Sequence, residues 1–211
     1  MAMPDRFFRF YKLEHAKLFV EEGVVSFGSA ASYDDSRFND AVRDDEQSRH
    51  SHPDPRRHSL SVAAPGGESR QIENVISLKI SYDIRHISGK PLSYYILCCS
   101  LTDDEQFFKR FDRECYITIN DVPEFHRRLD AAIHEQRPAW GGASGRVTYF
   151  KEGAVMVPER TLDLIFMKDT SYSWQKEFRY ALISPSQETL DKRVSVRLGP
   201  LKDICSITMR P

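Results

Sequence analysis

Cysteine is scarce in this chain, and its spacing argues against a disulfide or zinc framework. The 211 residues include four cysteines, Cys98, Cys99, Cys115 and Cys205, and no CxxC pair. The adjacent Cys98 and Cys99 would point to opposite faces of a strand. We therefore expect reduced thiols and a cytoplasmic protein.

Long apolar runs and an excess of one charge are also missing. No apolar stretch approaches the length that spans a membrane, and the N-terminal residues lack the apolar core of a signal peptide. Thirty basic and 31 acidic residues leave a net charge of −1. We expect no membrane partner and no strong attraction to nucleic acid. A local basic patch remains compatible with this net charge.

The common catalytic motifs are absent. The sequence has no GxGxxG, Walker A, HExxH or GxSxG pattern. This argues against the commonest classes of nucleotide-binding protein, zinc protease and serine hydrolase. His50, His52 and His58 lie close together, but no cysteine or carboxylate spacing supports metal ligation there. We therefore expect no metal site.

The chain has the composition and pattern of an α+β domain. Hydrophobic residues make up 40% and charged residues 29%, as in ordinary globular proteins. Apolar alternation predicts mostly antiparallel strands with a few short helices. The expected strands are 6–11, one beginning at 24, 60–64, 74–87, 93–102, 115–119, 146–150, 175–183, 194–198 and 204–209. The expected helices are 13–22, 103–111 and 122–136, and 162–168 is ambiguous.

The domain organisation is expected to be simple. Residues 43–58 are polar and carry no large apolar side chain, which predicts a surface insertion. The segment before the insertion holds too few elements to fold alone. We therefore expect one domain over 1–211.

The most informative segment is Trp174–Ile183, where polar residues begin an otherwise apolar strand. On a strand, Gln175 and Glu177 would share one face. Burying two polar groups beside a core costs free energy unless they have hydrogen-bond partners, so such groups are often structural ion pairs or functional residues. Glu177 could stabilise a cation or hold a ribose hydroxyl, while Gln175 orients an acceptor. The open alternative is a half-exposed strand end where Glu177 pairs with a nearby base such as Lys176 or Arg179.

Two further residues are candidates for ligand binding. Arg9 lies in the aromatic strand at 6–11, where a guanidinium could grip phosphate or carboxylate, unless it faces solvent. Ser100 ends the apolar strand that begins at Ser93 and could position a ligand amide, or simply lead into the next helix.

The order of several short motifs resembles a widespread bacterial and phage family of unknown function. The matching segments are Phe8-Arg9-Phe10-Tyr11-Lys12, Val24-Val25-Ser26-Phe27, Phe38-Asn39-Asp40, Cys98-Cys99-Ser100-Leu101 and Trp174-Gln175-Lys176-Glu177-Phe178-Arg179. Ala41 stands where that family usually has proline. A tryptophan and a histidine usual after the Cys-Ser strand are replaced by a region with Phe107, Phe108 and Phe111.

Arg9, Ser100 and Glu177 together also look like the arginine–serine–glutamate class of ADP-ribosyltransferases. The resemblance implies that class of fold and NAD as a substrate, with an unidentified macromolecular acceptor. It would make Arg9 a phosphate or ribose anchor, Ser100 a support for nicotinamide, and Glu177 the group that stabilises an oxocarbenium-like transition state. Gln175 would meet the acceptor. The residues that would stack on the ring are Tyr94, Tyr95 or Trp174.

Two other functions remain open from the sequence. The chain could be a non-catalytic phage or bacterial protein that binds a host factor through residues 43–58. It could also be a defence nuclease, with Asp34-Asp35 and Asp103-Asp104 binding Mg²⁺. Adjacent carboxylates are more often helix caps, so the nuclease ranks last.

Overall fold

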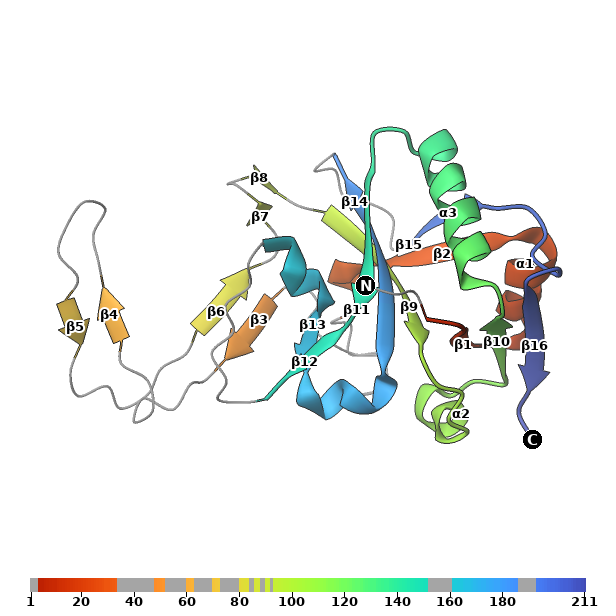
Figure 1. Cartoon of the computed structure of the whole chain (residues 1–211), viewed down its shortest axis with the longest axis horizontal. Helices are drawn as coiled ribbons and strands as arrows, with labels where there is room; N and C mark the ends of the chain where they lie inside the picture. The colour runs from red at the N-terminus through yellow and green to blue at the C-terminus, as the bar shows by residue number, and fades with distance from the viewer. Residues whose placement is uncertain are drawn as a thin grey trace.

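An antiparallel sheet of eight strands forms the centre of this computed structural model. Its strands are β1 (Phe7–Tyr11), β2 (Val24–Ser29), β9 (Ser93–Ser100), β10 (Cys115–Ile119), β11 (Gly141–Arg146), β14 (Glu177–Ser184), β15 (Arg193–Arg197) and β16 (Cys205–Met209). The order β11-β14-β9-β1-β10-β16 runs from left to right in Figure 1. The α+β class with mostly antiparallel sheet is confirmed.

The structure describes residues 4–33, 93–151, 161–185 and 193–211, together with the backbone of six short strands between 48 and 91. The remaining strands are β3 (Ser48–Ser51), β4 (Leu60–Val62), β5 (Arg70–Ile72), β6 (Ile80–Asp83), β7 (His86–Ile87), β8 (Lys90–Pro91), β12 (Thr148–Phe150) and β13 (Met167–Asp169). The α-helices are α1 (Leu13–Glu22), α2 (Gln106–Phe111) and α3 (Val122–Gln136). The 3₁₀ helices are η1 (Ala30–Ser32), η2 (Thr161–Phe166) and η3 (Thr170–Gln175).

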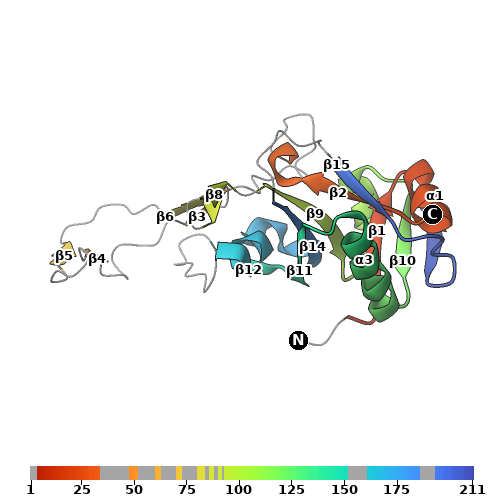
Figure 2. The same cartoon turned by 90° about the horizontal axis from the view of Figure 1, so that it is seen from above.

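The sheet divides at one edge of β9. Strand β14 pairs along the whole of β9 on one side. On the other side, Ser100 pairs with Phe8 of β1, whereas Ile96 pairs with Gly28 of β2. Strand β2 continues to β15, and Figure 2 shows these two strands together, apart from β1 and β10. We call the place where β1 and β2 diverge from β9 the fork.

The two faces of β9 bury different clusters, as strand alternation requires. Tyr95, Leu97 and Cys99 face a large core that includes residues of α1 and α3. Both helices lie toward the β10 and β16 end in Figure 1. Tyr94 and Ile96 face a smaller cluster with residues of η1 and η2. Strand β9 is therefore central and apolar on both faces, as predicted.

Local signals set the helix ends as predicted. Helix α1 ends at Gly23, whose φ of 65° suits glycine, and a Cβ there would lie 1.8 Å from the carbonyl oxygen of Gly199. Helix α3 begins after Asp121, whose Oδ1 accepts a hydrogen bond of 3.0 Å from the amide of Glu124. Both helices have the predicted bounds.

Several predicted boundaries are wrong. Gly141–Arg146 is an edge strand, although the expected strand there began only at residue 146, because the backbone of buried β14 needs hydrogen-bond partners along its outer side. Helix α2 begins at Gln106, with Asp104 Oδ1 accepting from the amide of Gln106, rather than at residue 103. The expected single strand 74–87 contains β6 and β7, which pair with β3 and β8.

The predicted strand 175–183 begins two residues later than expected. Gln175 ends η3, Lys176 adopts a left-handed conformation with φ of 45°, and β14 begins at Glu177. Gln175 and Glu177 are therefore not two positions of one strand.

Two other expectations can be placed only in part. The insertion at 43–58 lies outside the described residues, except for the backbone of β3, as do Phe38-Asn39-Asp40 and Asp34-Asp35. In the part of the chain that the structure describes, no helix is long and apolar enough to cross a membrane.

Candidate functional site

Charged and polar side chains are buried together where β14 begins. Lys168, Gln175, Glu177 and Arg179 are each less than 9% exposed, and Arg179 is completely buried. Glu177 and Arg179 are two apart on β14 and share a face, which is the face of the smaller apolar cluster. We call these four residues the buried charge cluster.

Glu177 is held by cations at both carboxylate oxygens. Arg179 Nε and Nη2 each lie 2.9 Å from Glu177 Oε2. Lys168 Nζ lies 3.4 Å from Glu177 Oε1. Burying a carboxylate is costly without such partners, and these two cations offset that cost. The predicted pairing with Arg179 therefore exists, but in the interior rather than at a half-exposed strand end.

Lys168 and Arg179 also tie the cluster to the segment that covers it. Lys168 Nζ donates a 3.0 Å hydrogen bond to Gln175 Oε1 and lies 4.5 Å from the ring centre of Tyr172. Arg179 Nη1 donates a 2.6 Å hydrogen bond to the carbonyl of Ile165 in η2. The cluster thus joins η2, β13 and η3 to the sheet. In this structure the side chain of Gln175 holds Lys168, whereas the sequence suggested that it orients an acceptor.

The backbone of Glu177 is fixed by Ser100 and Tyr149. Ser100 pairs directly with Glu177 across β9 and β14, and its Oγ donates a 3.0 Å hydrogen bond to the carbonyl of Gln175. The amide of Glu177 donates a 2.9 Å hydrogen bond to the hydroxyl of Tyr149. Burial raises the pKa of Tyr149 to about 12, so this hydroxyl stays protonated at neutral pH.

Arg9 lies one strand away, in the fork. Its Nε donates to the hydroxyl of Tyr11 and its Nη1 donates to the carbonyl of Cys98. Burial by itself lowers the pKa of Arg9, but interactions with Tyr11, Cys99 and Tyr33 outweigh it and raise that pKa above its ordinary value. Arg9 is half-buried rather than on an open solvent face.

The structure brings Arg9, Ser100 and Glu177 to one level of three adjacent strands. Ser100 pairs with Glu177 on one side and with Phe8, the neighbour of Arg9, on the other. Gln175 joins them through its carbonyl and through Lys168. Ser100, Gln175 and Glu177 therefore form one region, whereas Arg9, which alternates with Phe8 along β1, belongs to the face of Phe7 and Tyr11 on the other side of the sheet.

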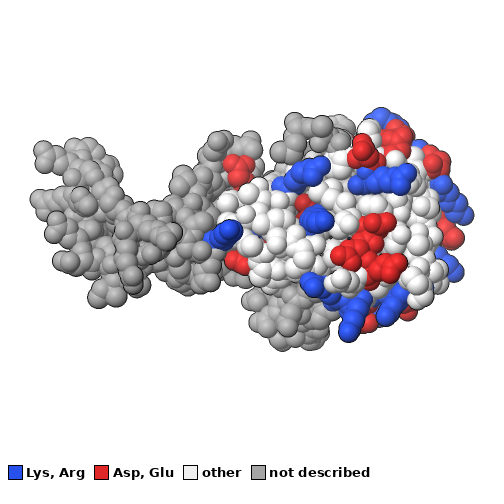
Figure 3. Space-filling model, turned by 60° about the horizontal axis from the view of Figure 1, so that its bottom comes forward, with Lys and Arg blue, Asp and Glu red and all other residues white. Residues whose placement is uncertain are grey.

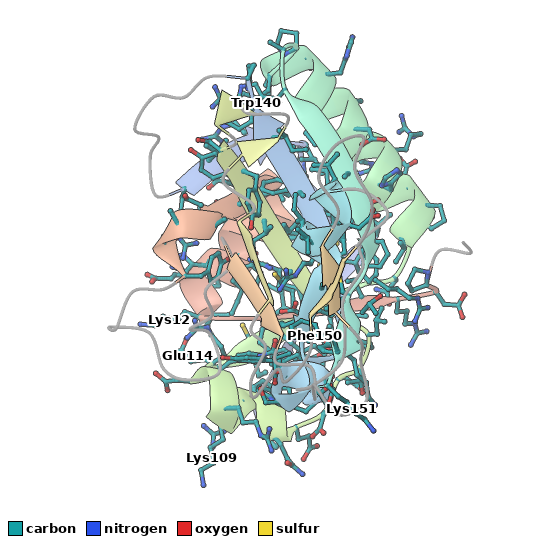
Figure 4. The ribbon with its side chains drawn as sticks, turned by 90° about the vertical axis from the view of Figure 1, so that its left-hand side faces the viewer. Lys12, Lys109, Glu114, Trp140, Phe150 and Lys151 are labelled. Atoms are coloured by element: carbon teal, nitrogen blue, oxygen red, sulfur yellow. The ribbon has the colours of Figure 1, made fainter. Side chains whose placement is uncertain are left out.

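The three aromatic candidates do not gather there. Tyr95 belongs to the opposite core and lies 5.6 Å from Trp140, whereas Trp174 packs against Phe107 and Phe111. Figure 4 shows that Trp140 and Lys109 of α2 lie at opposite ends of the molecule.

Tyr94 shares the face of Ser100 but is six residues away along β9, which is about 20 Å. The side chain of Tyr94 is also buried, with a relative exposure of 2%. A ring held beside Ser100 would therefore not reach Tyr94, nor Tyr95, which faces the opposite core.

Lys168, Arg179 and Tyr149 are the site residues that sequence reasoning missed or misread. A usable signal existed for Arg179, because it follows Glu177 by two positions in an apolar strand. Lys168 and Tyr149 come from other segments, and no short-range pattern connects them to Glu177.

One of the acidic residues considered for a nuclease, Asp104, has an ordinary structural role. Asp104 Oδ1 accepts from an amide at the start of α2. Among the described residues, no three His, Cys, Asp or Glu side chains gather to hold a metal ion. The face in Figure 3 carries acidic and basic side chains beside one another rather than a surface of one sign.

Comparison with known proteins adds no relative: no family model, curated protein or solved structure matches this chain.

Proposed function

We propose that this chain is an NAD-consuming protein similar to ADP-ribosyltransferases, a phage or bacterial defence effector that acts on a macromolecular acceptor. The observation that carries the proposal is the register of three strands. Ser100 is the direct partner of Glu177 and of Phe8, which precedes Arg9. The three residues named by the resemblance are more than 70 positions apart in sequence, yet they lie on adjacent strands, with Ser100 and Glu177 on one face and Arg9 in phase with the other face at the fork.

The chemistry suits a fixed carboxylate. In the proposed reaction, the bond between the ribose and nicotinamide breaks and its electron pair leaves with nicotinamide. The ribose carbon becomes cationic until an acceptor atom or water attacks it. A carboxylate offers about four acceptor positions on its two oxygens, so in this proposal Glu177 accepts a ribose hydroxyl and stabilises the cation.

The remaining residues act as supports in this proposal. Ser100 Oγ donates to the carbonyl of Gln175 and accepts from the amide of Thr102, so it positions the turn before Glu177. Arg9 uses Nε and Nη1 within the fold, and no hydrogen bond engages its Nη2 among the described residues. That amino group is suited to a phosphate oxygen.

Release of nicotinamide from labelled NAD, with cell lysate as the source of acceptor, tests the proposal. We expect turnover by the wild type and a loss of at least about 100-fold in Glu177→Gln. The matched control is Glu124→Gln, because Glu124 is a carboxylate of α3 that pairs with Arg127 and Arg128 and does not belong to the buried charge cluster. Circular dichroism would verify that each variant is folded. Equal, background-level release by wild type and Glu177→Gln would reject the proposal.

A second candidate is a non-catalytic protein that binds a host factor. The observation in its favour is that the ion pairs of Glu177 join η2, β13 and η3 to the sheet and need no ligand to do so. Deletion of residues 43–58 should then abolish capture of a partner, while Glu177→Gln, if folded, leaves capture unchanged. Capture that survives the deletion would remove this loop as the contact surface.

A further inference from the structure

Three arginines around the fork have no ion pair with any residue that the structure describes. Arg127, Arg128, Arg179 and Arg197 each pair with a carboxylate. Among the residues that the structure describes, Arg9, Arg113 and Arg193 have no carboxylate within ion-pair distance. From this grouping we infer that the fork is an anion site that binds a diphosphate group, with Arg9 at its base and Arg113 and Arg193 at its rim.

Arg193 approaches the fork from the β2 side. It pairs with Gly28, the residue of β2 that pairs with Ile96 at the fork. Tyr33 covers Gly28 closely, since a Cβ on Gly28 would lie 2.7 Å from the Tyr33 hydroxyl. The same tyrosine interacts electrostatically with Arg9. Arg193 and Arg9 therefore flank Tyr33 from two strands.

Arg113 approaches from the β1 side. It precedes Glu114, whose amide donates a 3.1 Å hydrogen bond to the carbonyl of Tyr11. The amide of Arg113 itself donates to the carbonyl of Phe108, which fixes the turn after α2. Arg113 is half-buried beside the end of β1, two residues along that strand from Arg9.

The three charges act on common neighbours. Burial lowers the pKa of Arg113, and Arg9 and Arg193 lower it further against an opposing effect of Asp112. Burial raises the pKa of Tyr11, while Arg9 and Arg193 both act to lower it. Like charges this close repel one another, and burial increases the cost. An anion bound between them would relieve both costs.

Phosphate chemistry fits the donors. A guanidinium is planar and binds phosphate oxygens with paired N–H groups, and it cannot lose its charge. Tyr11 accepts from Arg9, so its own hydroxyl proton remains to donate. A diphosphate carries two linked groups that accept such N–H donors, one for the base and one for the rim of the site. The inference deepens the proposed function, because NAD carries a diphosphate, and it rests on that function only for the identity of the ligand.

Isothermal titration of the full chain with inorganic pyrophosphate, and separately with NAD, tests the site. We expect the wild type to bind both ligands, and Arg113→Gln and Arg193→Gln each to weaken binding about tenfold. Arg197→Gln is the matched control, since Arg197 lies on the same strand and face as Arg193 but pairs with Glu22 at 3.6 Å. It should bind both ligands within about twofold of the wild type.

The outcomes separate this site from the proposed reaction. Absence of pyrophosphate binding by the wild type would overturn the anion site, and so would unchanged binding by Arg113→Gln and Arg193→Gln, whatever the NAD turnover. Pyrophosphate binding that these variants lose supports the site even if nicotinamide is never released, a result that would reject the reaction alone. Glu177→Gln should bind pyrophosphate as the wild type does. The Arg193 side chain is exposed, so Arg193→Gln should fold and give a clear answer.

Discussion

Two groups of charged side chains in this molecule have opposite surroundings. The buried charge cluster joins Glu177 to Arg179 and Lys168 in the interior. On the surface, Glu124 of α3 binds Arg127 and Arg128, and Arg128 also binds Asp203. The surface contacts are shorter than the Lys168–Glu177 contact, at 2.7 Å against 3.4 Å. Solvent nevertheless weakens them, so contact distance alone is a poor guide to the energetic importance of a pair.

The largest effect should follow from Arg179→Met. The change removes a completely buried guanidinium and leaves Glu177 Oε2 without its two donors. We expect a loss of about 3–5 kcal/mol in the free energy of unfolding, because one partner of a buried pair is removed. Urea denaturation at neutral pH measures this loss.

A double variant distinguishes pairing from packing as the cause. Arg179→Met combined with Glu177→Gln removes the charge that the single variant leaves behind. It should recover part of the lost stability. If the double variant is less stable than Arg179→Met, the ion pair is not the main contribution of Arg179.

An intermediate effect is expected for Tyr149→Phe. The hydroxyl of Tyr149 accepts the hydrogen bond of the Glu177 amide, and the substitution leaves that amide without its acceptor. Urea denaturation should show a loss of about 1–2 kcal/mol in the free energy of unfolding. If the site serves catalysis, a shift of Glu177 should also lower nicotinamide release. Tyr172→Phe is the matched control, because it keeps the ring beneath Lys168, and it should change stability less.

The smallest effect concerns the surface network and depends on pH. Hydrogen bonds from Arg127 and Arg128 lower the pKa of Glu124 from 4.5 to about 2. Because the folded carboxyl binds a proton less readily than the unfolded one, its contribution to stability is present above pH 4.5. That contribution is lost as the pH falls toward about 2. An NMR titration of the Glu124 carboxyl carbon measures the shift.

Salt and substitution sharpen the comparison. About 1 M salt should move the Glu124 pKa back toward its ordinary value, because the network is exposed to solvent. Arg128→Gln should do the same in part. The stability difference between wild type and Arg179→Met should change little with salt, because the buried cluster is shielded from ions. Equal salt sensitivity of the two groups would contradict the contrast between them.

Local patterns predicted a large part of the fold. Helices α1 and α3 were predicted with their bounds because a capping aspartate, an N-terminal proline and a glycine C-cap act within a few residues. Strand β11 could not be predicted. Its glycines lack strand propensity, and it is a strand because β14 needs partners for its outer backbone groups.

The candidate site was predictable only in part. Gln175 and Glu177 stood out as polar residues beside an apolar run, and both belong to the buried charge cluster. The reason offered for their convergence was wrong, since Gln175 ends a 3₁₀ helix and meets Glu177 through Lys168. No sequence pattern predicts that lysine's role, because η2 and η3 must first fold back onto the sheet.

The sequence by itself determined the α+β class, the main helices and the apolar β9, because periodicity and capping are local properties. Only the tertiary structure decided that Glu177 is buried between two cations, that Ser100 lies between Glu177 and β1, and that Arg113 and Arg193 lie near Arg9. Strand register brings Phe8, Ser100 and Glu177 together across more than 70 positions, and electrostatic interactions depend on distance in space rather than along the chain.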